Sequence, residues 1–195
     1  MIVAMGRWAP DASGRLAQAA MALYAEQGFE KTTAAEIAAR AGLTERTFFR
    51  HFADKREVLF YGNDSLQDML TGAIAGAPPD ATAMDAVGAA LQVTGAMIEE
   101  SPDLARLRNE IVSANAELRE RELTKMAGLA AAMAGALRER GVPDPAASLA
   151  AETGIAVFRV AFARWISGAG QSDLPAILRG SVEQLRSVLA GAGQA

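Results

Sequence analysis

The polar residues at positions 44–47 have the side chains that proteins use to contact DNA bases. Arg46 can donate two hydrogen bonds to O6 and N7 of a guanine. Thr44, Glu45 and Thr47 flank it and can make shorter contacts, and Glu45 can also reject some bases. The chemistry expected of this segment is therefore noncovalent recognition of a base edge.

A second set of residues is suited to the DNA backbone. Thr33, Arg50, His51 and Lys55 carry hydroxyl, guanidinium, imidazole and ammonium groups, and we expect them to hold phosphates and fix the register. His51 has an equally good alternative as a packing residue, because it precedes an apolar residue. Both sets need short helices to present them.

The segment from position 33 to 42 predicts the first of these helices. Thr33 followed by Glu36 is a capping box, in which each side chain satisfies a backbone N–H of the first turn. Gly42 lies where a left-handed residue ends a helix.

A second helix follows directly. Thr44 is a natural N-cap, and Phe48 and Phe52 lie four residues apart on one apolar face. Helix, glycine-containing turn and helix form the helix-turn-helix pattern, whose second helix enters the major groove. Asp54 and Glu57 repeat the capping-box pattern and predict a longer helix over 55–74.

The charge is distributed unevenly along a chain whose net charge is −4. Residues 1–62 carry 8 Lys/Arg and 7 Asp/Glu, a net charge of +1, and residues 63–195 carry 11 and 16, a net charge of −5. Residues 40–56 alone carry five basic against two acidic side chains. A modest positive patch predicts weak binding to random DNA and dependence on a good operator.

Enzyme chemistry finds little support in the residue types. His51 is the single histidine, and the chain has no cysteine, so neither a catalytic triad nor a His/Cys metal site can be assembled. Glu99 and Glu100 are neighbours on a helix and point apart. We expect no enzyme activity, no cofactor and no metal.

The segment 28–55 resembles the DNA-binding domain of the TetR family of transcriptional regulators. That family has a Gly-aromatic pair, Thr-Thr, Ile-Ala, Ala-Gly, a Ser/Thr cap, a Thr-aliphatic-Tyr-x-His/Tyr-Phe run and a Lys. The corresponding residues here are Gly28-Phe29, Thr32-Thr33, Ile37-Ala38, Ala41-Gly42, Thr44, Thr47–Phe52 and Lys55. Phe49 stands where the family usually has Tyr, so a hydroxyl contact to phosphate is lost, although the ring can still pack against sugar.

The whole chain is predicted to be all-α, with about nine helices. We expect helices near 11–27, 33–41, 44–52, 55–74, 82–100, 101–111, 115–140, 144–168 and 172–190. Residues 1–55 form a DNA-binding domain with a flexible N-terminal arm that includes Arg7, and residues 56–195 form a helical ligand-binding and dimerisation domain. The apolar runs are shorter than a membrane span requires, so we expect no membrane and a cytoplasmic location.

The last two helices are predicted to form a homodimer interface. The segment 146–167 is apolar on more than one face, which indicates burial on all sides. Two such helices from each subunit can pack as a four-helix bundle around a two-fold axis, which is also the dimer mode that the resemblance implies.

The resemblance further implies an effector pocket among the middle helices. Apolar, adaptable side chains are the candidate lining, with an ordinary core role as the alternative. The candidates are Met84, Leu91, Met97, Leu107, Ile111, Met126, Met133, Phe158, Phe162 and Trp165. Thr94, Asn115 and Arg159 are candidate polar anchors, or ordinary cap and surface residues.

These features predict a homodimeric regulator that binds a palindromic double-stranded operator. In the simplest form it is a repressor released by a small, largely apolar effector, although activation depends only on operator position. The alternative is a helical small-molecule-binding protein whose DNA-binding domain is degenerate. The acidic balance and Phe49 favour this alternative slightly, and the intact helix caps and the clustered positive charge oppose it.

Overall fold

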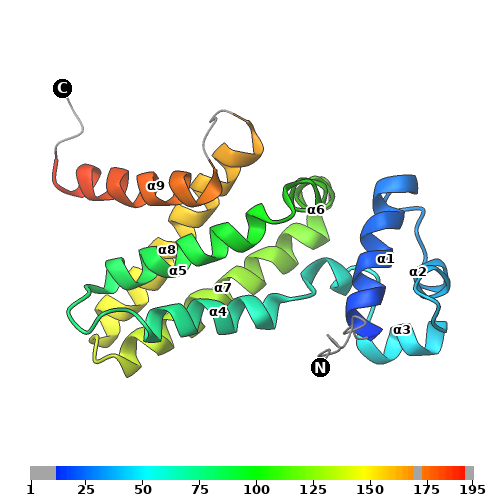
Figure 1. The fold of residues 1–195 in the computed structure, drawn as a ribbon, viewed down its shortest axis with the longest axis horizontal. Coiled ribbons are helices and arrows are strands. Elements are labelled where there is room, and N and C mark those ends of the chain that lie inside the picture. Colours follow the sequence, from blue (N-terminus) through cyan, green and yellow to red (C-terminus); the bar gives the residue numbers. More distant parts are fainter. Residues whose placement is uncertain (1–11, 169–172, 192–195) are drawn as a thin grey trace, which may run out of the picture. The chain divides into compact units, whose positions relative to one another are not determined.

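The computed structural model describes residues 12–168 and 173–191, and in these it contains nine α-helices, one 3-10 helix and no strand (Figure 1). The all-α prediction is confirmed. The helices fall into two compact units, Met1–Tyr61 and Gly62–Ala195. The N-terminal arm and Arg7 lie outside the described residues.

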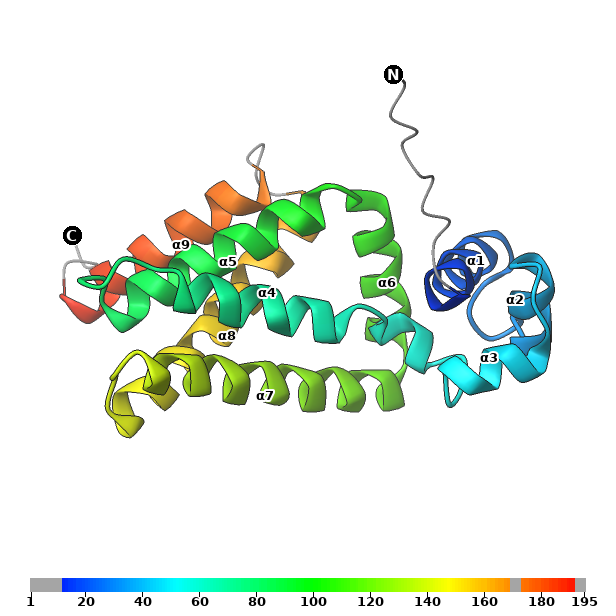
Figure 2. The ribbon, with the colours of Figure 1, turned by 60° about the horizontal axis from the view of Figure 1, so that its bottom comes forward.

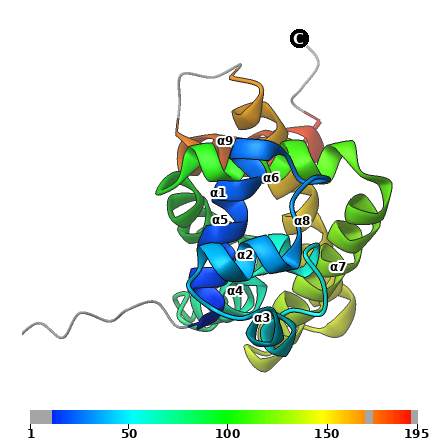
Figure 3. The ribbon, with the colours of Figure 1, turned by 90° about the vertical axis from the view of Figure 1, so that its right-hand side faces the viewer.

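The first unit contains three helices and a short 3-10 helix. These are α1 (Ala12–Gln27), α2 (Ala34–Arg40), α3 (Glu45–His51) and η1 (Glu57–Phe60), and Figure 3 shows the three α-helices in blue and cyan. Leu16, Ile37 and Phe48, one from each α-helix, are fully buried. The unit therefore has its own small core.

The turn between α2 and α3 is a Schellman motif. Gly42 has a φ of 67°, and its N–H bonds to the carbonyl of Ala39 while the N–H of Leu43 bonds to that of Ala38. Because an L-side chain is strained at this φ, glycine is the residue that ends α2 and turns the chain into α3.

The expected single helix over 55–74 is wrong. Gly62, with a φ of 87°, separates η1 from α4 (Asn63–Ala75), and a left-handed residue interrupts any helix. Asp54 does accept a hydrogen bond from the N–H of Glu57, but it opens only a 3-10 turn. Since η1 packs against α1, the compact units divide after Tyr61, whereas the sequence predicts a boundary after residue 55.

The second unit is a bundle of six helices. After α4 come α5 (Ala83–Glu99), α6 (Pro102–Ala114), α7 (Ala116–Glu139), α8 (Asp144–Ile166) and α9 (Leu174–Leu189). α4 packs on α5 and α7, and α8 packs on α5, α7 and α9 (Figure 2). The buried core includes Ile74, Val87, Met133, Ala151 and Leu178.

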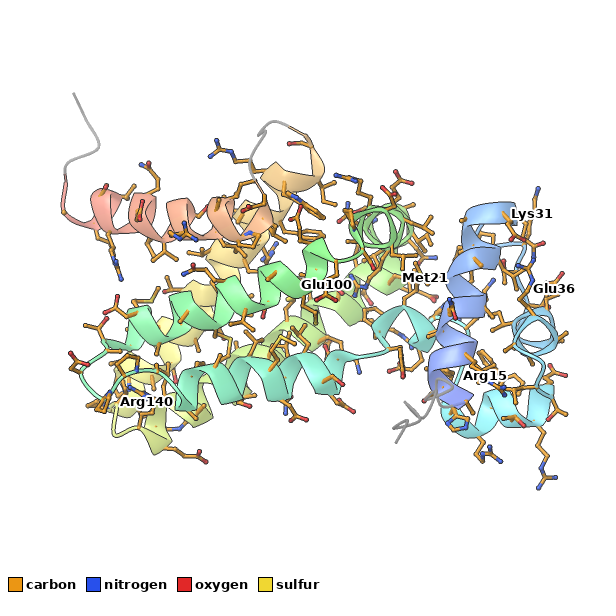
Figure 4. The ribbon with its side chains drawn as sticks, in the orientation of Figure 1. Arg15, Met21, Lys31, Glu36, Glu100 and Arg140 are labelled. Atoms are coloured by element: carbon orange, nitrogen blue, oxygen red, sulfur yellow. The ribbon has the colours of Figure 1, made fainter. Side chains whose placement is uncertain are left out.

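Polar clamps hold the loops of this bundle. Arg140, at the end of α7, donates hydrogen bonds to the carbonyls of Ala75, Ala77 and Pro78 in the α4–α5 loop (Figure 4). Glu99 accepts one from the N–H of Leu174 at the start of α9. Glu99 is therefore tied to a structural contact, while its neighbour Glu100 is exposed.

One helix among the described residues, α8, has the length and apolar composition to cross a membrane, with a mean hydropathy of 1.4 in its most apolar window. Its uninterrupted apolar runs are short, however, because Glu152, Arg159 and Arg164 divide them. Ala147, Ala151 and Ile155 of α8 nevertheless lie in the core of the second unit. Packing inside the bundle therefore accounts for part of this composition, while Leu149 and Val160 remain exposed.

Candidate nucleic-acid interface and effector site

Helix α3 presents a continuous exposed face of polar side chains. Glu45, Arg46, Arg50 and His51 are exposed, while Phe48 is fully buried and anchors the helix. Within the described residues Arg46 makes no ion pair, so its guanidinium is available to a partner. A terminal guanidinium nitrogen of Arg50 lies 3.4 Å from Nε2 of His51.

Both threonines at the start of α3 take part in its cap. The Thr44 hydroxyl accepts a hydrogen bond from the N–H of Thr47, and the two hydroxyl oxygens lie 2.9 Å apart. These hydroxyls are thus held in place at the N-terminal end of α3. In helix-turn-helix proteins this end of the second helix contacts base edges in the major groove.

Phe49 is an exposed aromatic residue on this helix. Its side chain is 53% exposed, and its ring contacts the buried Phe48 edge-on, with centroids 5.4 Å apart. The ring therefore keeps half of its surface for another molecule, and it has no hydroxyl to offer.

Thr33 and Glu36 form the capping box that begins α2. Glu36 accepts hydrogen bonds from the backbone N–H and the hydroxyl of Thr33, both at 2.8 Å, and the Glu36 N–H donates to the Thr33 hydroxyl. These bonds hold the pKa of the Glu36 carboxyl below its usual range. The Thr33 hydroxyl thus already donates within the protein, although it is exposed.

The side chain of Lys55 is directed at the turn that follows α1. Its ammonium donates to the carbonyls of Phe29, Glu30 and Thr32 at 2.8, 3.1 and 3.0 Å. It also lies 4.6 Å from the centroid of the Phe29 ring. The residue types gave no sign of this arrangement, because the acceptors are main-chain carbonyls.

Two more basic residues of the 40–56 segment have acidic neighbours. Arg40 donates two hydrogen bonds to Glu26 of α1, and the pKa of Glu26 is lowered mainly by this hydrogen bonding and further by the charge of Arg40. Arg56 lies 4.0 Å from Asp54. The outward positive charge of this segment is therefore concentrated on Arg46 and Arg50.

The candidate effector residues are distributed between the core and its edge. Leu91, Met133 and Trp165 are buried in the core of the second unit. The other seven are half-buried: Met84, Met97, Leu107, Ile111, Met126, Phe158 and Phe162.

Three of these residues form a row of rings on α8. The rings of Phe158 and Phe162 stack with centroids 5.6 Å apart, and Phe162 lies 5.7 Å from Trp165. The guanidinium of Arg106 from α6 lies over the Trp165 ring at 5.2 Å. This row combines an apolar surface with a cation at one end.

A shallow groove of about 140 Å³ lies between α5 and α9. Met84 lines it together with Gly88, Val182 and charged side chains, while the other nine effector candidates do not. The residues that the sequence suggested as an effector-pocket lining therefore do not line this groove as a group.

The candidate polar anchors differ in their environment. Asn115 is the N-cap of α7 and accepts a hydrogen bond from Leu118, and Arg159 is exposed. Thr94 of α5 is only 2% exposed, and its hydroxyl has no hydrogen-bond partner among the described residues. Among residues 12–168 and 173–191, no group of three or more His, Cys, Asp or Glu side chains could hold a metal ion.

Known regulators are similar to this chain in sequence and in fold. HTH-type transcriptional regulator TcmR of Streptomyces glaucescens is 32% identical over 78 residues, which are 40% of this chain and only 34% of that regulator. The structure of Thermus thermophilus FadR, a TetR family transcriptional repressor in complex with lauroyl-CoA, has a TM-score of 0.60 and 25% identity over 94% of this chain and 96% of its own. SmeT, the repressor of the Stenotrophomonas maltophilia multidrug efflux pump SmeDEF, has a TM-score of 0.61 and 20% identity over 88% and 87%, which shows a shared fold.

Two family models match separate parts of the chain. Residues 16–61 match bacterial regulatory proteins of the tetR family, and residues 81–190, more than half of the chain, match the MftR C-terminal domain. The first match covers the capped helices and the exposed face of α3. Together these matches show that the chain belongs to the TetR family of bacterial transcriptional regulators.

Proposed function

We propose that the protein is a homodimeric, ligand-responsive transcriptional regulator, most simply a repressor that leaves a palindromic operator when an effector binds. The observation that carries this proposal is the exposed face of α3, where Arg46 is free of ion pairs within the described chain and Thr44 and Thr47 are held by the cap. In this proposal Arg46 contacts a guanine, and Thr44, Glu45 and Thr47 contact neighbouring bases. Arg50, His51 and Thr33 lie against the backbone.

A second copy of the chain is the proposed partner of the last two helices. Leu149 and Val160 are 69% and 67% exposed, and they lie three turns apart on the same face of α8. Val188 and Leu189 at the end of α9 are 61% and 78% exposed. Large apolar side chains on neighbouring helices support an interface between subunits.

The proposed effector has a long apolar part. T. thermophilus FadR, 25% identical, was crystallised with lauroyl-CoA, which joins an apolar chain to a charged head. The ring row of Phe158, Phe162 and Trp165, with Arg106 beside it, offers matching chemistry. The effector acts only if it binds the DNA-free state more tightly than the DNA-bound state.

The test begins with selection of duplexes from a randomised library by the full-length protein. We expect a palindromic consensus, and a dimer at micromolar concentration by light scattering. Val160→Glu should yield monomers that bind the selected duplex poorly, while Leu104→Glu, on an exposed position of α6, is the matched control. The absence of salt-dependent DNA binding would instead favour a helical ligand-binding protein.

The effector is tested separately by thermal shift. Lauroyl-CoA should raise the unfolding temperature and release the selected duplex, with coenzyme A alone as the control for the head group. Release by coenzyme A to the same extent would contradict an apolar effector.

A further inference from the structure

We infer that Lys55 is a positioning residue that clamps the α1–α2 turn to the segment between α3 and η1, and that it is not a phosphate ligand. The inference rests on the proposed DNA-binding function. The family resemblance leads to the opposite expectation, in which the ammonium holds the DNA backbone.

The first argument is the number of hydrogen bonds. An ammonium group has three N–H donors, and those of Lys55 are directed at three carbonyls within 3.1 Å. A phosphate contact would require at least one of these bonds to be broken. The carbonyl thus uncovered would lose its partner in a partly buried place.

The second argument is electrostatic. The three carbonyls belong to Phe29, Glu30 and Thr32, in the turn that follows the C-terminal end of α1. Carbonyl oxygens carry partial negative charge, so three of them converging on one point attract a cation, and the face of the Phe29 ring adds to this attraction. Lys55 therefore occupies a site built for positive charge inside the unit.

The third argument is that the clamp is anchored from both sides. The backbone carbonyl of Lys55 accepts a hydrogen bond of 2.7 Å from the hydroxyl of the buried Tyr24. Burial is the main cause of the raised pKa of Tyr24, and the negative charge of Asp54 adds to it. The hydroxyl therefore stays protonated and continues to donate.

The turn that Lys55 holds leads directly into the DNA-binding helices. Thr32 is buried, and its hydroxyl donates to the carbonyl of Gly28 at 2.9 Å. Thr33 follows as the N-cap of α2. Loss of the clamp would loosen the start of α2, and through the α2–α3 turn it would disturb the position of Arg46.

The experiment compares the wild type with Lys55→Met, Lys55→Arg and the control Lys31→Met. Lys31 lies in the same turn, is exposed and extends away from the helices (Figure 4), so its replacement removes one charge and leaves the clamp intact. Each full-length protein is titrated with the selected duplex at several salt concentrations. Hydrogen exchange of residues 28–36 is measured without DNA.

We expect Lys55→Met to weaken binding about tenfold or more, because lost charge-assisted hydrogen bonds leave carbonyls unpaired. Its salt slope should equal that of Lys31→Met, and residues 28–36 should exchange faster than in that control. Lys55→Arg should restore neither property, because a planar guanidinium cannot place three donors of one nitrogen on three converging carbonyls.

The inference is overturned if Lys55→Met lowers the salt slope by about one unit per half-site more than the control does. Full rescue of binding by Lys55→Arg, or unchanged exchange in Lys55→Met, would also overturn it. If the wild type binds no DNA in a salt-dependent way, the proposed function fails, while the exchange measurement still decides whether the clamp exists.

Discussion

Gly154 of α8 faces Val87 of α5 so closely that a Cβ atom on Gly154 would lie 2.5 Å from Cγ1 of Val87 and 3.2 Å from Cε of Met133. Gly154→Ala should therefore destabilise the second unit by about 1–3 kcal/mol, because a β-branched side chain in a helix cannot move aside easily. Chemical denaturation measures the loss. Gly128→Ala, on α7 with nothing within 4 Å, is the control and should gain about 0.5–1 kcal/mol. Equal effects of the two changes would contradict the close contact.

Arg46→Ala tests base recognition by α3. It should cost about 1–3 kcal/mol on the selected duplex and relax the preference at one position of each half-site. Arg50→Ala is the comparison, since a phosphate contact should weaken binding to all sequences alike. An equal loss on selected and random DNA for Arg46→Ala would show that it does not read a base.

Phe49→Tyr should tighten operator binding slightly. The exposed ring is held by Phe48, so the added hydroxyl extends toward the partner without disturbing the core. Fluorescence anisotropy with the selected duplex measures the gain, and Phe49→Leu separates the effect of the ring from that of the hydroxyl. Unchanged affinity in Phe49→Tyr would mean that the ring only packs.

The capping box of α2 predicts a specific response to acid. The pKa of Glu36 is lowered by hydrogen bonds from Thr33, first from its backbone N–H and then from its hydroxyl. A carboxyl with a lowered folded-state pKa stabilises the fold above its ordinary pKa, and this contribution is lost as the pH falls through the lowered value. NMR titration should show the Glu36 pKa moving part of the way back in Thr33→Ala. An unmoved pKa would contradict the role of the hydroxyl.

The same substitution removes the cap itself. Thr33→Ala should lower the stability of the first unit by about 1 kcal/mol at neutral pH. Thr44→Ala, which removes the cap of α3, should have a comparable cost, since Thr44 accepts the equivalent bond from Thr47. Thermal unfolding followed by circular dichroism measures both.

Thr94→Val should leave the protein as stable as before or make it more stable, by up to about 1 kcal/mol. The hydroxyl is buried without a partner in the described chain, so its replacement by a methyl group removes an unpaired polar atom. If Thr94 binds the effector, the same variant should weaken the response to lauroyl-CoA. A clear loss of stability would show that the hydroxyl has a partner.

The sequence predicts most reliably those helix ends that are fixed by hydrogen bonds between residues close together in the chain. Thr33 with Glu36, Gly42 and Thr44 mark helix ends through bonds between residues at most five positions apart, and the structure has each of these helix ends. In the second unit, the helices expected to begin near residues 82, 115 and 144 begin at Ala83, Ala116 and Asp144. Local signals were sufficient for these boundaries because their physical causes are local.

Long-range contacts were the part that the sequence did not reveal. The acceptors of Lys55 are backbone carbonyls 23 to 26 positions away, and no residue type signals them. Gly62 is the same kind of signal as Gly42, but the apolar spacing of 55–74 continues past it, so the spacing alone predicted one uninterrupted helix. Among the apolar residues of the second unit, burial distinguishes Leu91 from Met97, although both lie on the same helix.

The pairing of Arg40 with Glu26 and the inward direction of Lys55 have a consequence for competition within the genome. A chromosome offers about 10⁶–10⁹ non-specific sites, and the fraction of a regulator lost to them grows with its sequence-independent affinity. A protein whose cations are paired internally neutralises few DNA phosphates. Few counterions are then released from DNA of arbitrary sequence when the protein binds it. Fewer molecules should then be held away from the operator by DNA of unrelated sequence.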